Sequence, residues 1–236
     1  FPFIARWLLA TVQRRRIIAR YTRPKHFDNN LIVIGAGSAG LVAALIAATV
    51  KAKVTLVEAH KMGGDCLNYG CVPSKALIKS AKLAHQMRHA DRYGLYSNIV
   101  NTDGGYPPFS FKAVMQRIHA VIAAIEPHDS VERYTGLGVE VLQGYAKIIN
   151  PWTVEISLNA DQGKPQVVRL TTRSIVIAAG ARPFVPPLPG LDAVDYVTSD
   201  TLWERFAQLD EIPKRLVVLG GGPIGCELAQ SFARLG

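Results

Sequence analysis

Cysteine is scarce in this chain, which has only three among its 236 residues. So few cysteines exclude the disulfide framework of a small secreted domain, and the length suits one large domain or two small ones. Cys66 and Cys71 form a close pair, whereas Cys226 stands alone. A zinc site would need a second pair of ligands at the right spacing, and we interpret His85 and His89 as solvated. The close pair therefore favours redox chemistry over metal binding.

Acidic residues are absent from the first 27 positions of the chain. The same stretch carries seven basic residues: Arg6, Arg14, Arg15, Arg16, Arg20, Arg23 and Lys25. The formal net charge of the whole chain is +9, and without these seven groups 20 basic residues face 18 acidic ones. The basicity thus belongs to a leader and not to a face that binds nucleic acid. Such a leader either contacts anionic lipid or is a solvated linker helix.

A membrane-spanning segment is not evident, although two stretches resemble one at first sight. Phe1–Val12 is too short to span a bilayer and is interrupted by Arg6. It resembles neither a complete signal peptide nor a cleavage site. The second stretch, residues 31–50, is uncharged, but its glycines and the β-rich segment after it predict a buried strand, a tight turn and a helix.

The order of the expected elements indicates an α/β fold with a doubly wound parallel sheet. A strand over 31–34, a helix over 41–49 and a strand over 53–58 form its opening unit. Further helices are predicted at 74–89 and 114–125. The remaining strands are expected at 139–142, 145–149, 153–158, 167–171, 174–178 and 216–219.

A glycine motif lies between the first strand and the first helix, with the residues Gly35, Ala36, Gly37, Ser38, Ala39 and Gly40. In this context, G-x-G-x-x-G predicts a dinucleotide site, in which the turn and the helix N-terminus approach a pyrophosphate. Glu58, at the end of the second strand, is expected to accept hydrogen bonds from a ribose. The same pattern returns at Gly220, Gly222 and Gly225. The alternative is that these glycines serve only tight turns.

The cysteine pair lies in the most specific segment of the chain, residues 63–75. A regular helix would separate Cys66 from Cys71 by about 7.5 Å along its axis, which exceeds the reach of a disulfide. A distorted turn is therefore needed, and Gly70 and Pro73 allow it. A strained, closely spaced disulfide is readily reduced. The alternative is a pair of buried, unbonded thiols.

Together these motifs resemble the pyridine nucleotide–disulfide oxidoreductases, whose redox segment reads G-G-T-C-x4-C-[IV]-P-S-K. The resemblance covers the chain from about Asn30 to Gly236. It implies an FAD-binding domain over 30–211 with a small antiparallel β insertion. It also implies that 212–236 is the first βα unit of an NAD(P)-binding domain. Residues 1–29 are then a leader, which we interpret as the tail of an upstream membrane domain.

The resemblance also implies roles for the residues around the cysteines. Cys71 would face the flavin as a thiolate, and Cys66 would exchange electrons with the substrate. Lys75 would lie near the flavin N5, and Glu227 would pair with Lys75. Asp65 stands where the family usually has threonine. This acid beside the first thiol is expected to raise the pKa of that thiol.

Residues 174–183 resemble the second FAD signature of the family, with Ala179 in place of its usual threonine. The backbone at Ala146 would meet the adenine end of FAD. The complete set of residues implied to bind FAD or NAD(P)H is Gly35, Ala36, Gly37, Ser38, Ala39, Gly40, Glu58, Gly64, Asp65, Cys66, Lys75, Ala146, Ala179, Gly180, Ala181, Gly220, Gly222 and Gly225.

The function that the resemblance implies is electron transfer between NAD(P)H, FAD, the Cys66–Cys71 disulfide and a dithiol, disulfide or metal-ion substrate. It would contribute to cell redox homeostasis in the cytoplasm or at the cytoplasmic face of the membrane, as a homodimer when complete. The residue that selects NAD or NADP and the family's His–Glu pair are expected after Gly236. This stretch alone is therefore expected to be inactive. The alternative is a non-catalytic flavin-binding fragment or a membrane-tethered electron carrier.

Overall fold

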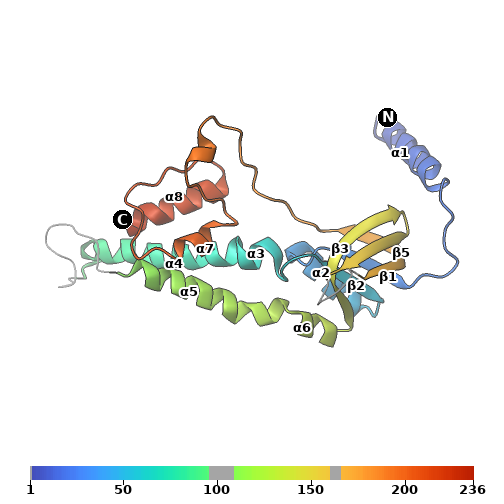
Figure 1. Ribbon diagram of the computed structural model, residues 1–236, viewed down its shortest axis with the longest axis horizontal. Coiled ribbons are helices and arrows are strands. Elements are labelled where there is room, and N and C mark those ends of the chain that lie inside the picture. The colour runs from blue at the N-terminus through green and yellow to red at the C-terminus, as the bar shows by residue number, and fades with distance from the viewer. Residues whose placement is uncertain (1, 96–108, 160–165) are drawn as a thin grey trace. The chain divides into compact units, whose positions relative to one another are not determined.

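The chain folds into two compact units, each made of two separate stretches (Figure 1). The computed structural model describes residues 2–95, 109–159 and 166–236. Unit 1 comprises Phe1–Met62 and Asp129–Ala179, and unit 2 comprises Gly63–His128 and Gly180–Gly236. These boundaries differ from the domain boundaries that the sequence motifs imply, which fall between residues 29 and 30 and between residues 211 and 212. The predicted division into domains therefore stays a prediction.

Unit 1 is built on five strands, which are β1 Asn29–Ile34, β2 Val54–Glu58, β3 Val139–Asn150, β4 Thr153–Leu158 and β5 Val167–Ile177. The strands β5, β1, β2 and β3 lie next to one another in a parallel sheet. The strands β3, β4 and β5 form an antiparallel meander. Each strand thus has two hydrogen-bonded neighbours, and the five close into a barrel. The predicted α/β class, a parallel sheet with a small antiparallel insertion, is confirmed.

Strand β3 belongs to both sheets and changes from one to the other at Gly144. Its first half pairs with β2 as far as Glu58 opposite Gln143, and its second half pairs with β4 from Gly144 opposite Leu158. A Cβ atom on Gly144 would lie 2.3 Å from the carbonyl oxygen of Ser157. The two strands predicted at 139–142 and 145–149 are therefore one bent strand. The same holds for β5, which covers the strands predicted at 167–171 and 174–178.

The core of unit 1 has two layers, which explains why β1 reads as a continuous apolar run. Val33 and Leu56 point to the layer that contains helix α2 (Ser38–Thr49) and helix α6 (Val131–Gly136). Ile32 and Val57 point to the opposite side, where they pack with residues of β4. Both faces of the central strands are therefore buried, and their sequences do not alternate between apolar and polar residues.

Unit 2 is mainly helical, with α3 Gly64–Asn68, α4 Cys71–Arg88, α5 Phe111–Ile125, α7 Leu202–Phe206 and α8 Pro223–Leu235. Its core joins α4, α5, α7 and α8 around buried apolar residues, among them Leu77, Met115, Trp203 and Leu235. The ring of Phe206 meets those of Phe111 and Phe232 edge-on. Short 3₁₀ segments occur at Ala90–Tyr93, Glu126–Asp129 and Leu191–Ala193.

The strand predicted at 216–219 is not formed, which corrects the expectation of a complete βα unit at the end of the chain. Residues 215–221 have no regular secondary structure, and the side chain of Val217 is 83% exposed. A β-strand requires hydrogen bonds from a neighbouring strand, and none of the described strands pairs with this segment. The helix that follows, α8, is formed as predicted.

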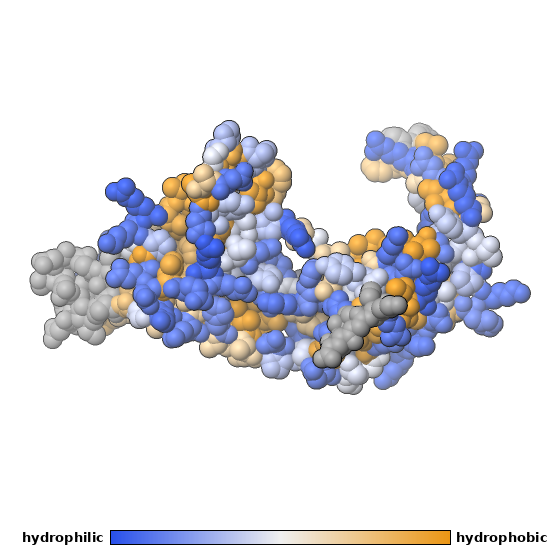
Figure 2. All heavy atoms as spheres, viewed as in Figure 1, coloured by the Kyte–Doolittle hydropathy of each residue, from blue (hydrophilic) through white to orange (hydrophobic). Residues whose placement is uncertain are grey.

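The leader forms helix α1 (Pro2–Ile18), whose apolar side chains face solvent. Figure 2 shows apolar and basic residues together on this helix. Phe3, Trp7 and Leu9 are 85%, 66% and 63% exposed. Apolar residues dominate its first three turns, and its basic residues gather at its C-terminal end around Arg15 and Arg16. Over the described residues, no helix combines the length and the apolar character needed to cross a membrane.

The leader is attached to the barrel by a short segment with specific contacts. The guanidinium carbons of Arg23 and Arg173 lie 5.7 and 5.6 Å from the centre of the Phe27 ring. The Asp28 carboxylate accepts hydrogen bonds from the backbone N–H and the hydroxyl of Thr171, at 2.8 and 2.7 Å. These bonds lower the pKa of Asp28. The start of β1 is thereby fixed next to β5.

The bend at Gly144 gives a test of the barrel. We expect Gly144→Ala to lower the free energy of unfolding by about 2–3 kcal/mol, because its methyl group would clash with a backbone carbonyl oxygen. Urea unfolding measures this change. The control is Gly136→Ala, since a Cβ atom there would meet nothing within 4 Å. Equal stability of the two variants would contradict the crossing of β3 between the sheets.

Candidate functional site

The first glycine motif forms a tight turn between β1 and α2. Gly35 has a φ of 102°, and a Cβ atom on it would lie 2.2 Å from the carbonyl oxygen of Ala178. A Cβ atom on Gly40 would lie 1.8 Å from the carbonyl oxygen of Gly35. Ala178 also donates its N–H to the carbonyl of Ile34 at 2.8 Å. The motif therefore needs glycine in order to bring the helix, the turn and the end of β5 together.

The start of α2 leaves its first N–H groups available to an anion. Gly37 is the N-cap, has extended backbone and offers no side-chain cap, and the helix begins at Ser38. Uncapped N–H groups at a helix N-terminus bind phosphate well, and the helix dipole adds to the attraction. Ala39 follows in the first turn of the helix. The residues present thus fit the pyrophosphate of a dinucleotide such as FAD.

Glu58 fixes this turn directly. One of its carboxylate oxygens accepts the N–H of Ala36 at 2.6 Å, and the other accepts the N–H of His60 at 2.8 Å. The sequence predicts that Glu58 binds a ribose, and in the structure its carboxylate also accepts hydrogen bonds from the turn. Ala146 lies on β3, opposite Ile156 of β4.

A contact that sequence reasoning missed lies beside Glu58. The hydroxyl of Tyr145 and Nε2 of His60 are 3.1 Å apart, and the two rings meet edge-on. These residues are 85 positions apart. No local pattern in the sequence signals the pair, because only the pairing of β2 with β3 brings it together.

The second glycine motif repeats the conformation of the first. Gly220 has a φ of 115°, and a Cβ atom on Gly225 would lie 2.1 Å from the carbonyl oxygen of Gly220. Gly222 caps α8 with nearly the same backbone angles that Gly37 has before α2. The predicted turn is therefore formed, although the strand before it is not. A second helix start of the kind that binds phosphate is present in unit 2.

The two cysteines lie on either side of a turn between α3 and α4. Cys66 belongs to α3, and Cys71 is the first residue of α4. The carbonyl of Asp65 accepts the N–H groups of Tyr69 and Gly70, at 2.8 and 2.6 Å. The indole N–H of Trp203 binds the carbonyl of Tyr69 at 2.6 Å. Helix α3 ends at Asn68 and α4 begins at Cys71, so the predicted break in helical structure is present.

Both cysteines are free thiols in the structure, and their surroundings differ. Cys71 is exposed, whereas Cys66 is partly buried. Burial, followed by a hydrogen bond to the Cys71 thiol, raises the pKa of Cys66 to about 11, and the nearby Asp65 adds to the rise. The pKa of Asp65 is itself raised by burial and by the charge of Asp200. The positive end of the α4 dipole lies at Cys71.

Lys75 and Glu227 form the predicted ion pair, with 2.8 Å between Nζ and Oε2. Their side chains are 60% and 42% exposed, so the pair lies at the surface. It joins α4 to the first turns of α8 within unit 2. Water screens such a pair, and its contribution to stability is small.

The remaining residues predicted to bind FAD lie at the start of α3 and directly after β5. Gly64 is the first residue of α3, and Ala179, Gly180 and Ala181 follow the end of β5 in a segment without regular secondary structure. Gly180 has a φ of 69°. The first glycine motif, Glu58 and Ala146 are thus together in unit 1, and the cysteines, Lys75 and Glu227 are together in unit 2.

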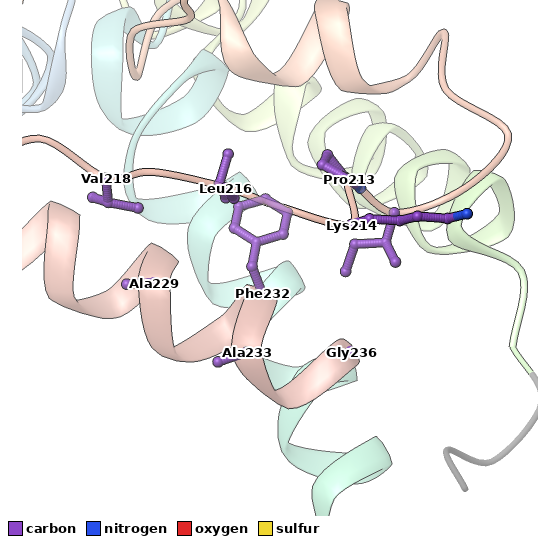
Figure 3. A pocket seen from close by; sticks show the side chains of 9 residues that line it. Pro213, Lys214, Leu216, Val218, Ala229, Phe232, Ala233 and Gly236 are labelled. Atoms are coloured by element: carbon purple, nitrogen blue, oxygen red, sulfur yellow. The ribbon is translucent and has the colours of Figure 1, made fainter.

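A small apolar pocket of about 190 Å³ lies beside α8 (Figure 3). Phe232 points from α8 towards Leu216 and Pro213, and Lys214 adds a charged side chain to the lining. None of the predicted site residues lines it. Among the described residues, no group of three or more His, Cys, Asp or Glu side chains is placed to hold a metal ion.

Comparison with known proteins identifies the family. The profile described as "Pyridine nucleotide-disulphide oxidoreductase" matches residues 29–236. The chain belongs to this family. The resemblance drawn from the cysteine and glycine motifs is therefore confirmed, and enzymes of this family use FAD and NAD(P)H.

Several relatives are similar over most of the chain. A mercuric reductase of Bacillus cereus is 33% identical over 89% of this chain and 30% of its own length. A dihydrolipoyl dehydrogenase of Mycoplasma pneumoniae is 36% identical over 88% of this chain and 42% of its own length. The chain spans less than half of these relatives.

A solved structure shows the same fold. It is the Cu(II) complex of the HOCl-induced flavoprotein disulfide reductase RclA from Escherichia coli. It has a TM-score of 0.67 and 27% identity, and the match covers 88% of this chain and 40% of that protein.

Because the ion pair of Lys75 and Glu227 is exposed, we expect the two residues to contribute almost independently to the free energy of unfolding. In a double-mutant cycle of Lys75→Met and Glu227→Gln, we expect a coupling energy below about 1 kcal/mol, because both side chains reach solvent. Urea unfolding of the four proteins gives this energy. A coupling of several kcal/mol would show that the pair is shielded from water in solution.

Proposed function

We propose that this protein is an FAD-dependent disulfide oxidoreductase that uses NAD(P)H and the Cys66–Cys71 pair. The observation that supports it most is the turn between α3 and α4, which interrupts the helix between Cys66 and Cys71 and leaves both as free thiols on either side of it. When bound, FAD would accept a hydride from NAD(P)H and pass the electron pair to the disulfide. Breaking the S–S bond then leaves one thiol and one thiolate.

The residues of this chain would divide the remaining steps among them. Cys71, at the start of α4, is suited to hold the negative charge, since a helix N-terminus favours an anion. Cys66 would attack a substrate disulfide and form a mixed disulfide, which Cys71 resolves by attacking Cys66. This releases the reduced substrate and restores the Cys66–Cys71 bond. Lys75, held by Glu227, would provide a positive charge near the reduced flavin.

We propose a dithiol, a disulfide or a thiol-binding metal ion as the substrate. The names of the relatives support a dithiol or disulfide on the one hand and a metal ion on the other, since one relative is called dihydrolipoyl dehydrogenase and another mercuric reductase. The reaction would run as a reduction by NAD(P)H or, with a dithiol substrate, in reverse. The proposed assembly is a homodimer, and the proposed location is the cytoplasm.

The second candidate function is a flavin-binding electron carrier tethered to the membrane, with an idle disulfide. The exposed leader supports the tether. Most of its apolar residues precede the three arginines 14–16 along the helix axis, although Arg6 lies among them. Such a helix suits insertion by its apolar end, with the arginines among anionic headgroups. In this second candidate, the leader would hold the protein at the cytoplasmic face of the membrane.

The proposed function predicts different spectra for the two cysteine variants. Two-electron reduction of the FAD-bound protein should produce a long-wavelength charge-transfer band between the Cys71 thiolate and the flavin. Cys71→Ser should abolish this band, whereas Cys66→Ser should show it before reduction. Absorption spectra during titration with dithionite make the comparison. Identical spectra for both variants would overturn the assignment of the two roles.

The leader predicts binding to anionic vesicles. Replacing Arg14, Arg15 and Arg16 by Gln should weaken binding to phosphatidylglycerol vesicles by about a hundredfold, since each basic group contributes about 1 kcal/mol. Co-sedimentation measures binding, and neutral phosphatidylcholine vesicles should retain little protein. The control replaces three exposed basic residues outside the leader: Lys82, Arg92 and Lys214. Equal losses in both triple variants would argue against a specific role for the leader.

A further inference from the structure

We propose that one end of the barrel in unit 1 is a membrane contact of its own, which lies on anionic lipid headgroups beside the leader. It is the end at which β1 and β2 begin. We call it the basic mouth and define it by Arg23, Phe27, Lys53, Trp152 and Arg173. The proposal rests on the tether that belongs to the second candidate function, and it adds the surface with which the folded unit meets the lipid.

Neighbouring strands place two basic side chains at one level of this end. The register of β5 with β1 sets Arg173 opposite Asn30, and the N–H of Lys53, just before β2, donates to Oδ1 of Asn30 at 2.8 Å. Side chains at one level of neighbouring strands share a face, and both basic side chains are exposed. Lys53 and Arg173 therefore present two positive charges to solvent on either side of β1.

The leader joins the barrel at this same end. The ring of Phe27 is contacted both by Arg23, which belongs to the leader, and by Arg173, which belongs to β5. Strand β1 begins two residues after Phe27, at Asn29. The basic end of the leader and the basic mouth are thus continuous, so a surface that binds one lies next to the other.

Basic residues outnumber acidic ones in the segments that meet at this end. These segments are 23–30, 50–54, 137–140, 150–153 and 171–173, with five basic residues and two acidic ones. Both acids already accept a hydroxyl group, Asp28 that of Thr171 at 2.7 Å and Glu140 that of Thr55 at 2.6 Å. The excess of positive charge is attracted by an anionic surface.

Apolar side chains accompany the charges. The carbonyl of Trp152, in the β3–β4 hairpin, accepts the N–H of Thr172 at 2.8 Å, which sets the hairpin next to Arg173. Val50, before β2, is 72% exposed, and Leu137, before β3, is 42% exposed. Tryptophan and exposed aliphatic side chains among basic ones suit the headgroup level of a bilayer. Nucleic acid would be attracted by the charge alone, so these side chains favour lipid as the partner.

The contact would also orient the cofactor site. The first glycine turn follows the ends of β1 and β5, where Ala178 donates its N–H to the carbonyl of Ile34. Strand β1 has six residues, so about 17 Å separate this turn from the basic mouth. With the mouth on the headgroups, the turn predicted to bind FAD points away from the lipid.

Vesicle binding of a double variant tests the charges. Lys53→Gln with Arg173→Gln should weaken co-sedimentation with phosphatidylglycerol vesicles by about tenfold to thirtyfold, because two basic groups leave the headgroups. The matched control is Lys147→Gln with Arg169→Gln, which removes two exposed charges from the barrel wall, where both residues lie opposite Glu155. Its binding should stay within about twofold of wild type. Lys53→Arg with Arg173→Lys keeps both charges and should bind like wild type.

Tryptophan fluorescence tests the contact itself with all charges in place. The chain has three tryptophans, of which Trp7 is in the leader and Trp203 is 3% exposed. In a Trp7→Phe variant, phosphatidylglycerol vesicles with brominated acyl chains should therefore quench the emission of Trp152. A Trp7→Phe, Trp152→Phe variant retains only Trp203 and should lose almost no emission.

The outcomes separate the basic mouth from the tether. A wild-type protein that does not sediment with phosphatidylglycerol vesicles would overturn the tether, and the contact with it. Binding that depends on Arg14, Arg15 and Arg16 but leaves Trp152 unquenched would keep the tether and overturn the contact. Equal losses in the Lys53, Arg173 variant and in its control would overturn the specific role of these two charges. Tighter binding to duplex DNA than to the vesicles would overturn lipid as the partner.

Discussion

Every strand of unit 1 has two hydrogen-bonded neighbours, because β3 and β5 each cross from the parallel sheet into the antiparallel one. The rest of the unit depends on this closure. It fixes the end of β5 beside the first glycine turn, where the Ala178 carbonyl would lie 2.2 Å from a Cβ atom on Gly35. It also places Glu58 at the end of a strand buried on both sides. The segment at 216–219 has the same apolar character but no described strand beside it, and it stays unpaired.

The cysteine turn follows a different principle, in which burial and helix position, and not strand pairing, create the asymmetry. Cys66 is partly buried in α3, and Cys71 is exposed at the N-terminus of α4. The ion pair of Lys75 and Glu227 then keeps a cation nearby on α4. Two sulfurs of the same chemical type thus acquire different surroundings within a single turn.

Much of this arrangement could be predicted from the sequence where the signal is local. The glycine turns, the break between the cysteines and the partner of Lys75 are all found as expected. The bend at Gly144 could not be predicted, because it depends on the Ser157 carbonyl of another strand. The contact of His60 with Tyr145 likewise requires the register of β2 and β3. The segment at 216–219 shows the converse limit: its sequence pattern is that of a strand, yet none of the described strands pairs with it.

The interleaving of the two units has a consequence for how the protein folds as it is made. Asp28 and Thr171, which join the start of β1 to β5, are 143 residues apart. At a synthesis rate of about 5–20 residues per second, β1 waits roughly ten seconds or more for its partner to leave the ribosome. During that time the apolar strands β1 and β2 are without their outer neighbours. Closing the barrel therefore depends on a pairing that is distant in sequence, and such pairing slows folding.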